Sequence, residues 1–180
     1  MLFRSGFEKG ALSIAATLTA RRIVGANTRV RLSAAAREVA EWKTLADDPA
    51  KPGWSTPQPL EVTGTAPREY GAKIAVLIDA GCRSSCESLA LLMRTLGARL
   101  IGETTGGSGG APITFTMPKS NARVRVPARA SFDLSGTPVE GTGVKPDDTV
   151  TRTRADVASR RDVALEHALD HVCAHGPGRC

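Results

Sequence analysis

Aromatic side chains are scarce in this sequence, and long apolar runs are missing. Phe, Trp and Tyr together make up 4% of the 180 residues, so aliphatic and alanine side chains have to fill most of the interior. No stretch reaches the roughly 18 consecutive apolar residues that a membrane-spanning helix needs. The mildly apolar residues 11–20 follow the charged pair Glu8–Lys9 and contain several hydroxyl side chains, which does not fit a secretory signal. No membrane span and no signal peptide are therefore expected in this chain.

Charge is also unremarkable in its distribution. The formal net charge is +6, but the basic residues are scattered, and only short pairs such as Arg21–Arg22 and Arg160–Arg161 occur. A nucleic-acid site usually needs a basic cluster, often with aromatic side chains between the charges. We therefore expect a solvated basic surface and no nucleic-acid partner. With 41% apolar residues, the length suits one domain with its own core.

Cysteine and histidine are few and gather in two places. The cysteines are Cys82, Cys86, Cys173 and Cys180. They allow three disulfide pairings or unbridged thiols, and sequence spacing alone does not choose among these. The histidines are His167, His171 and His175, all in the last part of the chain beside Cys173. This group suggests a zinc site, but its spacing matches no known zinc finger. We expect neither a metal nor a cofactor.

The first part of the chain predicts helices followed by a long connection. Apolar residues at helical spacing favour a helix over 8–24 that ends at Gly25–Ala26–Asn27. A short strand over 28–33 and a helix over 33–46, capped by Ser33, follow. Residues 47–70 are rich in proline and polar residues and are predicted to be a long internal loop.

The second part alternates strands and helices, which indicates an α/β domain. Residues 73–79 form an apolar run that is typical of a buried parallel strand. We then predict a helix over 84–97 with Leu89, Leu92 and Leu96 inward, a second short strand over 98–103 and a glycine-rich loop over 104–110. A hairpin with strands over 113–117 and 122–134, a turn-rich segment over 136–148 and a closing helix over 154–173 with Val157 inward follow. Residues 1–180 are therefore predicted to form a single, partial domain with a flexible tail over 174–180.

The hexapeptide CRSSCE over 82–87 lies where the apolar strand meets the helix. A turn of this kind can present a serine hydroxyl above the sheet, and the unpaired N–H groups of the helix start favour an anion there. A tetrahedral oxyanion of acyl transfer is such an anion. Serine is equally suited to capping a helix, and the sequence lacks a G-x-S-x-G elbow. From the residues alone, a nucleophile and a simple N-cap both remain open.

Four segments, in this order, resemble the C-terminal processing (tail-specific) serine peptidase family. They are AVLIDAGCRSSCESLA, ARLIGETTGGSGG, FDLSGTPVEGTGVKPDD and ASRRDVALEHAL. The resemblance implies a crotonase/ClpP-like α/β peptidase domain with a mixed sheet and flanking helices. It places the nucleophile at Ser84, with Ser85 as the alternative nucleophile and as an oxyanion donor through its backbone N–H. Gly6 is the implied second oxyanion donor, and Glu87 is expected to anchor the helix.

The general base is the point at which the sequence departs from the family. One branch uses a lysine in the glycine loop, and Ser108 takes that position here. The tricorn-like branch uses an upstream histidine supported by a glutamate, which corresponds to Glu140. Glu140 could equally pin a turn. All histidines follow Ser84 in the chain, so the resemblance implies an N-terminally truncated member, or one whose base comes from a missing N-terminal region or a partner chain.

The function implied is serine-type endopeptidase activity on extended or C-terminal polypeptide segments through an acyl-enzyme. We expect this isolated chain to be incomplete or inactive. One alternative is a non-catalytic peptide- or apolar-ligand-binding module on the same fold. A crotonase-like acyl-CoA enzyme is a third hypothesis, disfavoured because that family does not need the E-G-x-G-V-x-P-D segment. Family members are commonly exported, so a periplasmic or extracellular location is expected, which would suit a Cys82–Cys86 or Cys173–Cys180 bridge.

Overall fold

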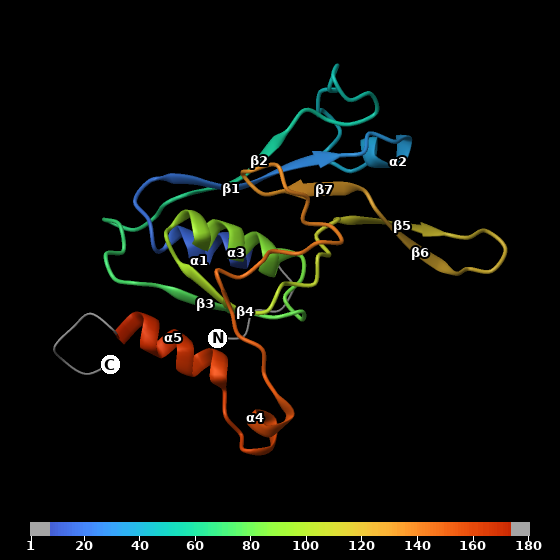
Figure 1. Cartoon of the computed structure of the whole chain (residues 1–180). Helices are drawn as coiled ribbons and strands as arrows, with labels where there is room; N and C mark the ends of the chain where they lie inside the picture. Colours follow the sequence, from blue (N-terminus) through green and yellow to red (C-terminus); the bar gives the residue numbers. More distant parts are fainter. Residues whose placement is uncertain (1–7, 174–180) are drawn as a thin grey trace.

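Two three-stranded sheets with a helical layer between them form the frame of the molecule (Figure 1). The computed structural model describes residues 8–173. The antiparallel sheet has the order β2-β1-β7, formed by Gln58–Thr63, Arg22–Val30 and Arg129–Phe132. The parallel sheet has the order β3-β4-β8, formed by Ala75–Ile78, Arg99–Gly102 and Asp148–Thr149. The α/β class predicted from the sequence is confirmed.

Helices cover both faces of the parallel sheet. The helix α3 (Ser85–Thr95) lies between the two sheets with α1 (Glu8–Ala16) beside it, and α5 (Val163–Cys173) packs on the far side of β3 and β4 (Figure 1). The short helices are α2 (Ala34–Arg37) and α4 (Arg154–Ala158). None of the helices in residues 8–173 combines the length and the apolar character needed to cross a lipid bilayer.

The core is centred on α3, whose Leu89 and Leu92 are buried as predicted. The strand β1 approaches this helix very closely. A Cβ placed on Gly25 would lie 2.8 Å from the backbone nitrogen of Leu92, so any larger residue would push the helix off the strand. The β-bulge between Val24 and Ala26 falls at this position.

A two-stranded ribbon, β5 (Pro112–Thr116) and β6 (Arg123–Pro127), projects from the body (Figure 1). Its two ends meet at one carbonyl group. The Gly110 oxygen accepts hydrogen bonds from the N–H groups of Ala128, at 2.9 Å, and Arg129, at 2.8 Å. The single strand predicted over 122–134 is therefore wrong: the chain bends at Ala128, and β7 leaves the ribbon to pair with β1.

The predicted helix over 8–24 is too long. It ends at Ala16, and β1 begins at Arg22 because residues 22–28 pair with β2. Gly25 therefore lies inside a strand instead of ending a helix. The pairing of β1 with β2 was not predicted, because β2 lies within the proline-rich segment 47–70. This segment was predicted to be a loop throughout, but it is a loop only on either side of β2.

Two further predicted helices are longer than the helices in the structure. Ser33 caps α2 as predicted, accepting from the Ala36 N–H at 3.2 Å, but α2 ends at Arg37 and the residues up to 46 form turns. The predicted helix over 154–173 divides into α4 and α5, since Arg160 adopts a φ of 56° between them. Val157, predicted to face the core, is 60% exposed.

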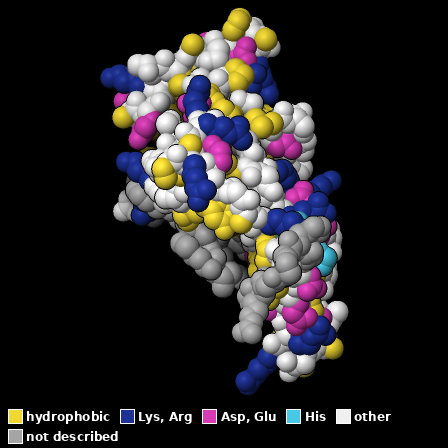
Figure 2. Space-filling view, turned by 90° about the vertical axis from the view of Figure 1, so that its left-hand side faces the viewer, with side chains coloured by type: hydrophobic (Ala, Val, Ile, Leu, Met, Phe, Trp, Pro, Cys, Tyr) yellow, Lys and Arg dark blue, Asp and Glu magenta, His cyan; other side chains and the backbone are white. Residues whose placement is uncertain are grey.

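Charged side chains of both signs share the surface. On the face in Figure 2, Lys and Arg side chains are interspersed with Asp, Glu and apolar groups. Exposed ion pairs such as Arg37–Asp47 and Arg161–Glu166 contribute to this mixture. Such pairs are screened by solvent and contribute little to stability.

Candidate active site

The turn that carries Ser84 joins β3 to α3. β3 runs parallel to β4, with Ala75 opposite Arg99 and Ile78 opposite Gly102. After β3, Asp79 organises the turn: its backbone oxygen accepts from the Cys82 N–H at 2.9 Å, and its carboxylate accepts from the Gly81 N–H at 2.8 Å. Ser84 therefore lies beyond the carboxyl end of a parallel strand, where open α/β sheets place their ligand sites.

Ser84 has a backbone conformation that non-glycine residues rarely adopt. Its φ is 54° and its ψ is −120°, and α3 begins at the next residue. A conformation of this kind costs about 1–3 kcal/mol and persists only where the surroundings impose it. α/β-hydrolases expose their serine nucleophile on a strained strand-to-helix turn of the same type. The strain therefore favours a functional role for Ser84 over simple helix capping.

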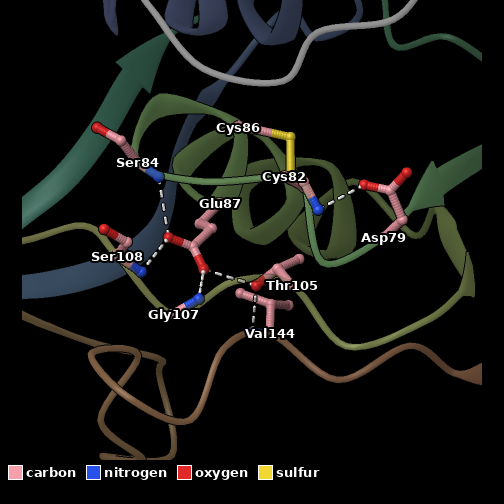
Figure 3. Close-up of a disulfide and its surroundings, with 10 residues drawn as sticks. Asp79, Cys82, Ser84, Cys86, Glu87, Thr105, Gly107, Ser108 and Val144 are labelled. Carbon is pink, nitrogen blue, oxygen red and sulfur yellow. Dashed lines mark hydrogen bonds between the residues drawn. A yellow bond between two sulfur atoms is a disulfide. The ribbon is translucent and has the colours of Figure 1, made fainter.

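The buried carboxylate of Glu87 holds this turn against the glycine loop. Its side chain is almost fully buried and accepts four hydrogen bonds (Figure 3). The Oε2 atom accepts from the N–H groups of Ser84 at 2.9 Å and Ser108 at 3.0 Å. The Oε1 atom accepts from the Thr105 hydroxyl at 2.6 Å and the Gly107 N–H at 2.7 Å. Glu87 thus anchors the helix start as expected, and it also fixes the loop, which the sequence did not reveal.

The E-G-T-G-V segment packs against the other side of the glycine loop. The Thr105 hydroxyl accepts from the Val144 N–H at 2.7 Å, and the Thr105 N–H donates to the Val144 oxygen at 3.1 Å. A Cβ on Gly143 would lie only 2.2 Å from the Thr105 oxygen. This close approach, together with a φ of 70°, explains why glycine is needed there. The nucleophile turn, the glycine loop and this segment form one connected unit.

A disulfide bridges Cys82 and Cys86 across the same turn (Figure 3). The two Cα atoms are 5.3 Å apart, and both residues are buried. Of the pairings that the sequence left open, this one is present in the structure. Cys173 is disulfide-bonded as well. The Cys173–Cys180 pairing, the other possibility that the sequence left open, involves a residue outside the described range.

Ser85 differs from Ser84 in the exposure of its side chain. It is the first residue of α3, so its N–H has no acceptor within the helix and is available to an oxyanion. Its side chain is 3% exposed, and its hydroxyl has no partner among the described residues. Ser84 is only half-buried, and Figure 3 shows its hydroxyl directed away from the Glu87 carboxylate. This accessibility favours Ser84 over Ser85 as the nucleophile.

Glu140 is a second carboxylate beside the glycine loop, near Gly109. Its Oε2 atom accepts from the Ser131 N–H at 2.7 Å, so Glu140 does pin a turn. Its Oε1 atom is buried and has no hydrogen-bond partner within residues 8–173. A Cβ on Gly109 would lie 3.2 Å from this atom and 3.9 Å from the Glu87 Oε2 atom. A buried acceptor for which residues 8–173 supply no donor therefore lies beside the glycine loop.

The predicted residues outside this cluster have other surroundings. The His167 Nε2 atom lies 3.4 Å from the Asp148 carboxylate, and the His171 oxygen accepts from Lys73 Nζ at 3.2 Å. The pKa of Asp148 is lowered from 3.8 to about 2, mainly by its hydrogen bond to Arg99, with His167 adding to the effect. Gly6 and His175 lie outside the described residues. Within the described range, no group of three or more His, Cys, Asp and Glu side chains could hold a metal ion.

The comparison with known protein families decides the assignment. The profile of peptidase family S41 matches residues 8–150, which is most of the chain. The chain belongs to peptidase family S41. The resemblance to C-terminal processing serine peptidases is thereby confirmed. Three of the four segments that carried it lie within the S41 match, and the fourth follows residue 150. No curated protein sequence matches the chain.

Solved structures agree with the S41 assignment at the level of the fold. A predicted peptidase from Parabacteroides merdae ATCC 43184 has a TM-score of 0.76 and 21% identity, covering 98% of this chain and 51% of its own. Mature CPAF complexed with lactacystin has a TM-score of 0.68 and 17% identity, covering 90% and 40%. The photosystem II D1 C-terminal processing protease has a TM-score of 0.54 and 19% identity, covering 82% and 32%. The S41 chain described here spans about half the length of the first of these structures.

Proposed function

We propose that this chain carries the nucleophile part of a serine peptidase that cleaves extended or C-terminal polypeptide segments through an acyl-enzyme. The observation that carries the proposal is the strained backbone of Ser84 at the start of α3, held by the buried carboxylate of Glu87. Membership of peptidase family S41 supports it. No cofactor takes part in the proposed chemistry.

In the proposed reaction the Ser84 hydroxyl oxygen attacks the carbonyl carbon of the scissile peptide bond. The negative charge that forms on the carbonyl oxygen is stabilised by the Ser85 N–H and by the start of α3. Gly6 is proposed to supply a second N–H. The amine leaves with a proton, and water then attacks the acyl-enzyme to release the acid and regenerate Ser84. An extended substrate would bind by adding a strand to a sheet edge.

The proton transfers need a general base, because a serine hydroxyl is a weak nucleophile at neutral pH. We propose that the base is an imidazole from a partner chain or from a region of the protein outside this sequence. Its N–H would donate to the free Oε1 atom of Glu140, and this would orient the ring in the way that triad carboxylates do. This atom is buried and has no hydrogen-bond partner in the described part of the chain, which supports the assignment. Ser108, in the position of the lysine of the other branch, carries no basic group.

A location outside the cytoplasm is part of the proposal. The Cys82–Cys86 disulfide supports it, because structural disulfides persist mainly in oxidising compartments.

Chemical rescue tests the proposal directly. The 180-residue chain is incubated with a fluorophosphonate probe and increasing concentrations of imidazole, and the labelled peptide is identified by mass spectrometry. We expect slow labelling that imidazole accelerates, located on Ser84 and lost in Ser84→Ala. Ser159→Ala, at the C-cap of α4, serves as the matched control. Labelling that persists in Ser84→Ala and disappears in Ser85→Ala would move the nucleophile to Ser85.

The second candidate function is a binding module without catalysis. The observation that favours it is that no histidine or lysine contacts Ser84 in the hydrogen bonds and ion pairs of residues 8–173. This candidate predicts no labelling at any imidazole concentration, together with saturable binding of an extended peptide or an apolar fluorophore. The two outcomes are mutually exclusive.

A further inference from the structure

The disulfide that brackets Ser84 takes no part in the proposed peptidase reaction. Cys82 and Cys86 are bonded to each other, and only three residues separate them, with Ser84 in the middle. Both sulfur-bearing residues belong to the buried core cluster that includes Ile78 and Leu91. The bridge therefore ties the end of the strand-to-helix turn to the first turn of α3.

The Cys82 side of the turn is held from outside as well. The Cys82 oxygen accepts from the Gly106 N–H at 2.9 Å, so one end of the bridge is fixed to the glycine loop. The other end is part of α3. A chain of three residues between two fixed ends has few backbone conformations available, and the positive φ of Ser84 lies among them. Strained conformations persist only where such constraints coincide.

Removal of the bridge leaves a weaker set of constraints. The Ser84 N–H would still donate to Glu87 at 2.9 Å, but nothing covalent would hold Cys82 beside Cys86. Ser84 could then rotate to negative φ, which is the ordinary conformation of a helix N-cap. This rotation would redirect the Ser84 hydroxyl and would leave the turn as a simple helix start.

We propose that the Cys82–Cys86 disulfide positions Ser84, so that the nucleophile turn reaches its reactive geometry only after the two thiols are oxidised. The proposal rests on the peptidase function proposed above. Oxidation proceeds by thiol–disulfide exchange. One thiolate attacks a small-molecule or protein disulfide and forms a mixed disulfide with release of one thiolate, and the other thiolate then attacks the cysteine sulfur of that mixed disulfide and displaces the second thiolate. The oxidant is released as two thiols, and two electrons leave the cysteine pair. Because both cysteines are buried, the bridge is set during folding, and the turn is locked only in a compartment that oxidises thiols.

The test compares Cys82→Ala/Cys86→Ala with Cys173→Ala/Cys180→Ala, which also removes two cysteines but leaves the turn intact. The first measurement is amide hydrogen exchange by NMR at Ser84, with Ile101 in β4 as an internal reference. We expect exchange at Ser84 to be about tenfold faster or more without the bridge, while Ile101 changes by less than about twofold. The matched control is expected to exchange like the wild-type chain at both positions. Exchange at Ser84 that stays within about twofold of wild type would overturn the proposal.

The second measurement is the imidazole-assisted labelling rate of Ser84. We expect it to fall by about tenfold or more in the Cys82→Ala/Cys86→Ala chain and to be retained in the control. Refolding of the control chain from denaturant with a phosphine present, with loss of the bridge checked by mass spectrometry, repeats both measurements without altering the turn sequence, and covers the case in which the double variant does not fold. If the wild-type chain never labels, the peptidase function fails, whereas the exchange rates still decide whether the bridge holds the turn.

Discussion

The carboxylates of Glu87 and Glu140, both beside the glycine loop, differ in the number of hydrogen bonds that they accept. Glu87 accepts four hydrogen bonds from the nucleophile turn and the loop. Glu140 accepts one from Ser131, and its other oxygen is buried without a partner in the described part of the chain. Buried polar atoms in native proteins are nearly always paired. The Glu87 carboxylate is therefore fully hydrogen-bonded, whereas the Glu140 carboxylate has one buried oxygen without a donor among residues 8–173.

Glu87→Gln is expected to have the largest effect, because it disrupts the four hydrogen bonds that the Glu87 carboxylate accepts. The amide group would turn its N–H atoms toward two of the four donors and leave them buried without an acceptor. We expect the free energy of unfolding to fall by about 2–4 kcal/mol, measured by urea denaturation. Glu61→Gln is the matched control. It removes an exposed pair with Arg22 and should cost less than about 1 kcal/mol. Equal losses in the two variants would contradict the role of Glu87 as an anchor.

Glu140→Gln tests the role of the Glu140 carboxylate, whose Oε1 atom has no partner among the described residues. The amide oxygen can still accept from the Ser131 N–H, so the free energy of unfolding should change by less than about 1 kcal/mol. The amide nitrogen cannot accept from an imidazole N–H, however. We expect imidazole rescue of labelling to weaken by about tenfold or more. A variant that loses stability but keeps full rescue would reduce Glu140 to a residue that only pins a turn.

Ser84→Gly separates the effect of backbone strain at this position from the effect of losing the Ser84 hydroxyl. Glycine adopts positive φ without steric cost, although it loses more backbone entropy on folding. The balance predicts a stability gain of about 1 kcal/mol relative to Ser84→Ala, measured by chemical denaturation of both variants. Neither variant should be labelled at this position. Equal stability of the two would show that the turn does not hold Ser84 under strain.

A third carboxylate, Asp148, extends the comparison to a group paired with cations instead of amides. Its pKa is lowered to about 2, chiefly by Arg99. Its contribution to stability is therefore present above pH 3.8 and is lost as the pH falls from 3.8 through about 2. Arg99→Gln should return the pKa toward 3.8, as measured by NMR titration of the Asp148 carboxyl. An unchanged titration would assign the lowered pKa of Asp148 to His167 instead of Arg99. Of the variants proposed at Glu87, Glu140, Ser84 and Arg99, we expect Arg99→Gln to have the smallest effect on stability.

The local part of the site was predictable from the sequence, because it depends on neighbours along the chain. The apolar run before Gly81 and the helical pattern after Ser85 predict the strand, turn and helix that the structure shows. The anchoring role of Glu87 followed from its place three residues after Ser84. The roles of Ser84, Ser85 and Glu140 in catalysis stay predictions.

The remaining features depend on contacts between distant segments, which local patterns do not encode. The sequence does not reveal that Glu87 binds Thr105 and Gly107, because nothing in the glycine loop marks which acceptor its N–H groups will find. The first residues of β1, 22–24, were assigned to a helix, and only its end overlaps the strand predicted over 28–33, because the partner strand β2 lies in a distant proline-rich segment. The Cys82–Cys86 pairing was one of several that the count of cysteines allowed.

The shared carbonyl of Gly110 has a consequence for how this chain can vary. Because Ala128 and Arg129 both donate to it, the two ends of the β5–β6 ribbon are clamped together next to the glycine loop. Changes in ribbon length need not be transmitted past that clamp, and exposed hairpin tips tolerate insertions well. The ribbon can thus be shortened, lengthened or replaced by a reporter peptide as an independent module, which makes residues 118–122 the natural place to attach a probe to this protein.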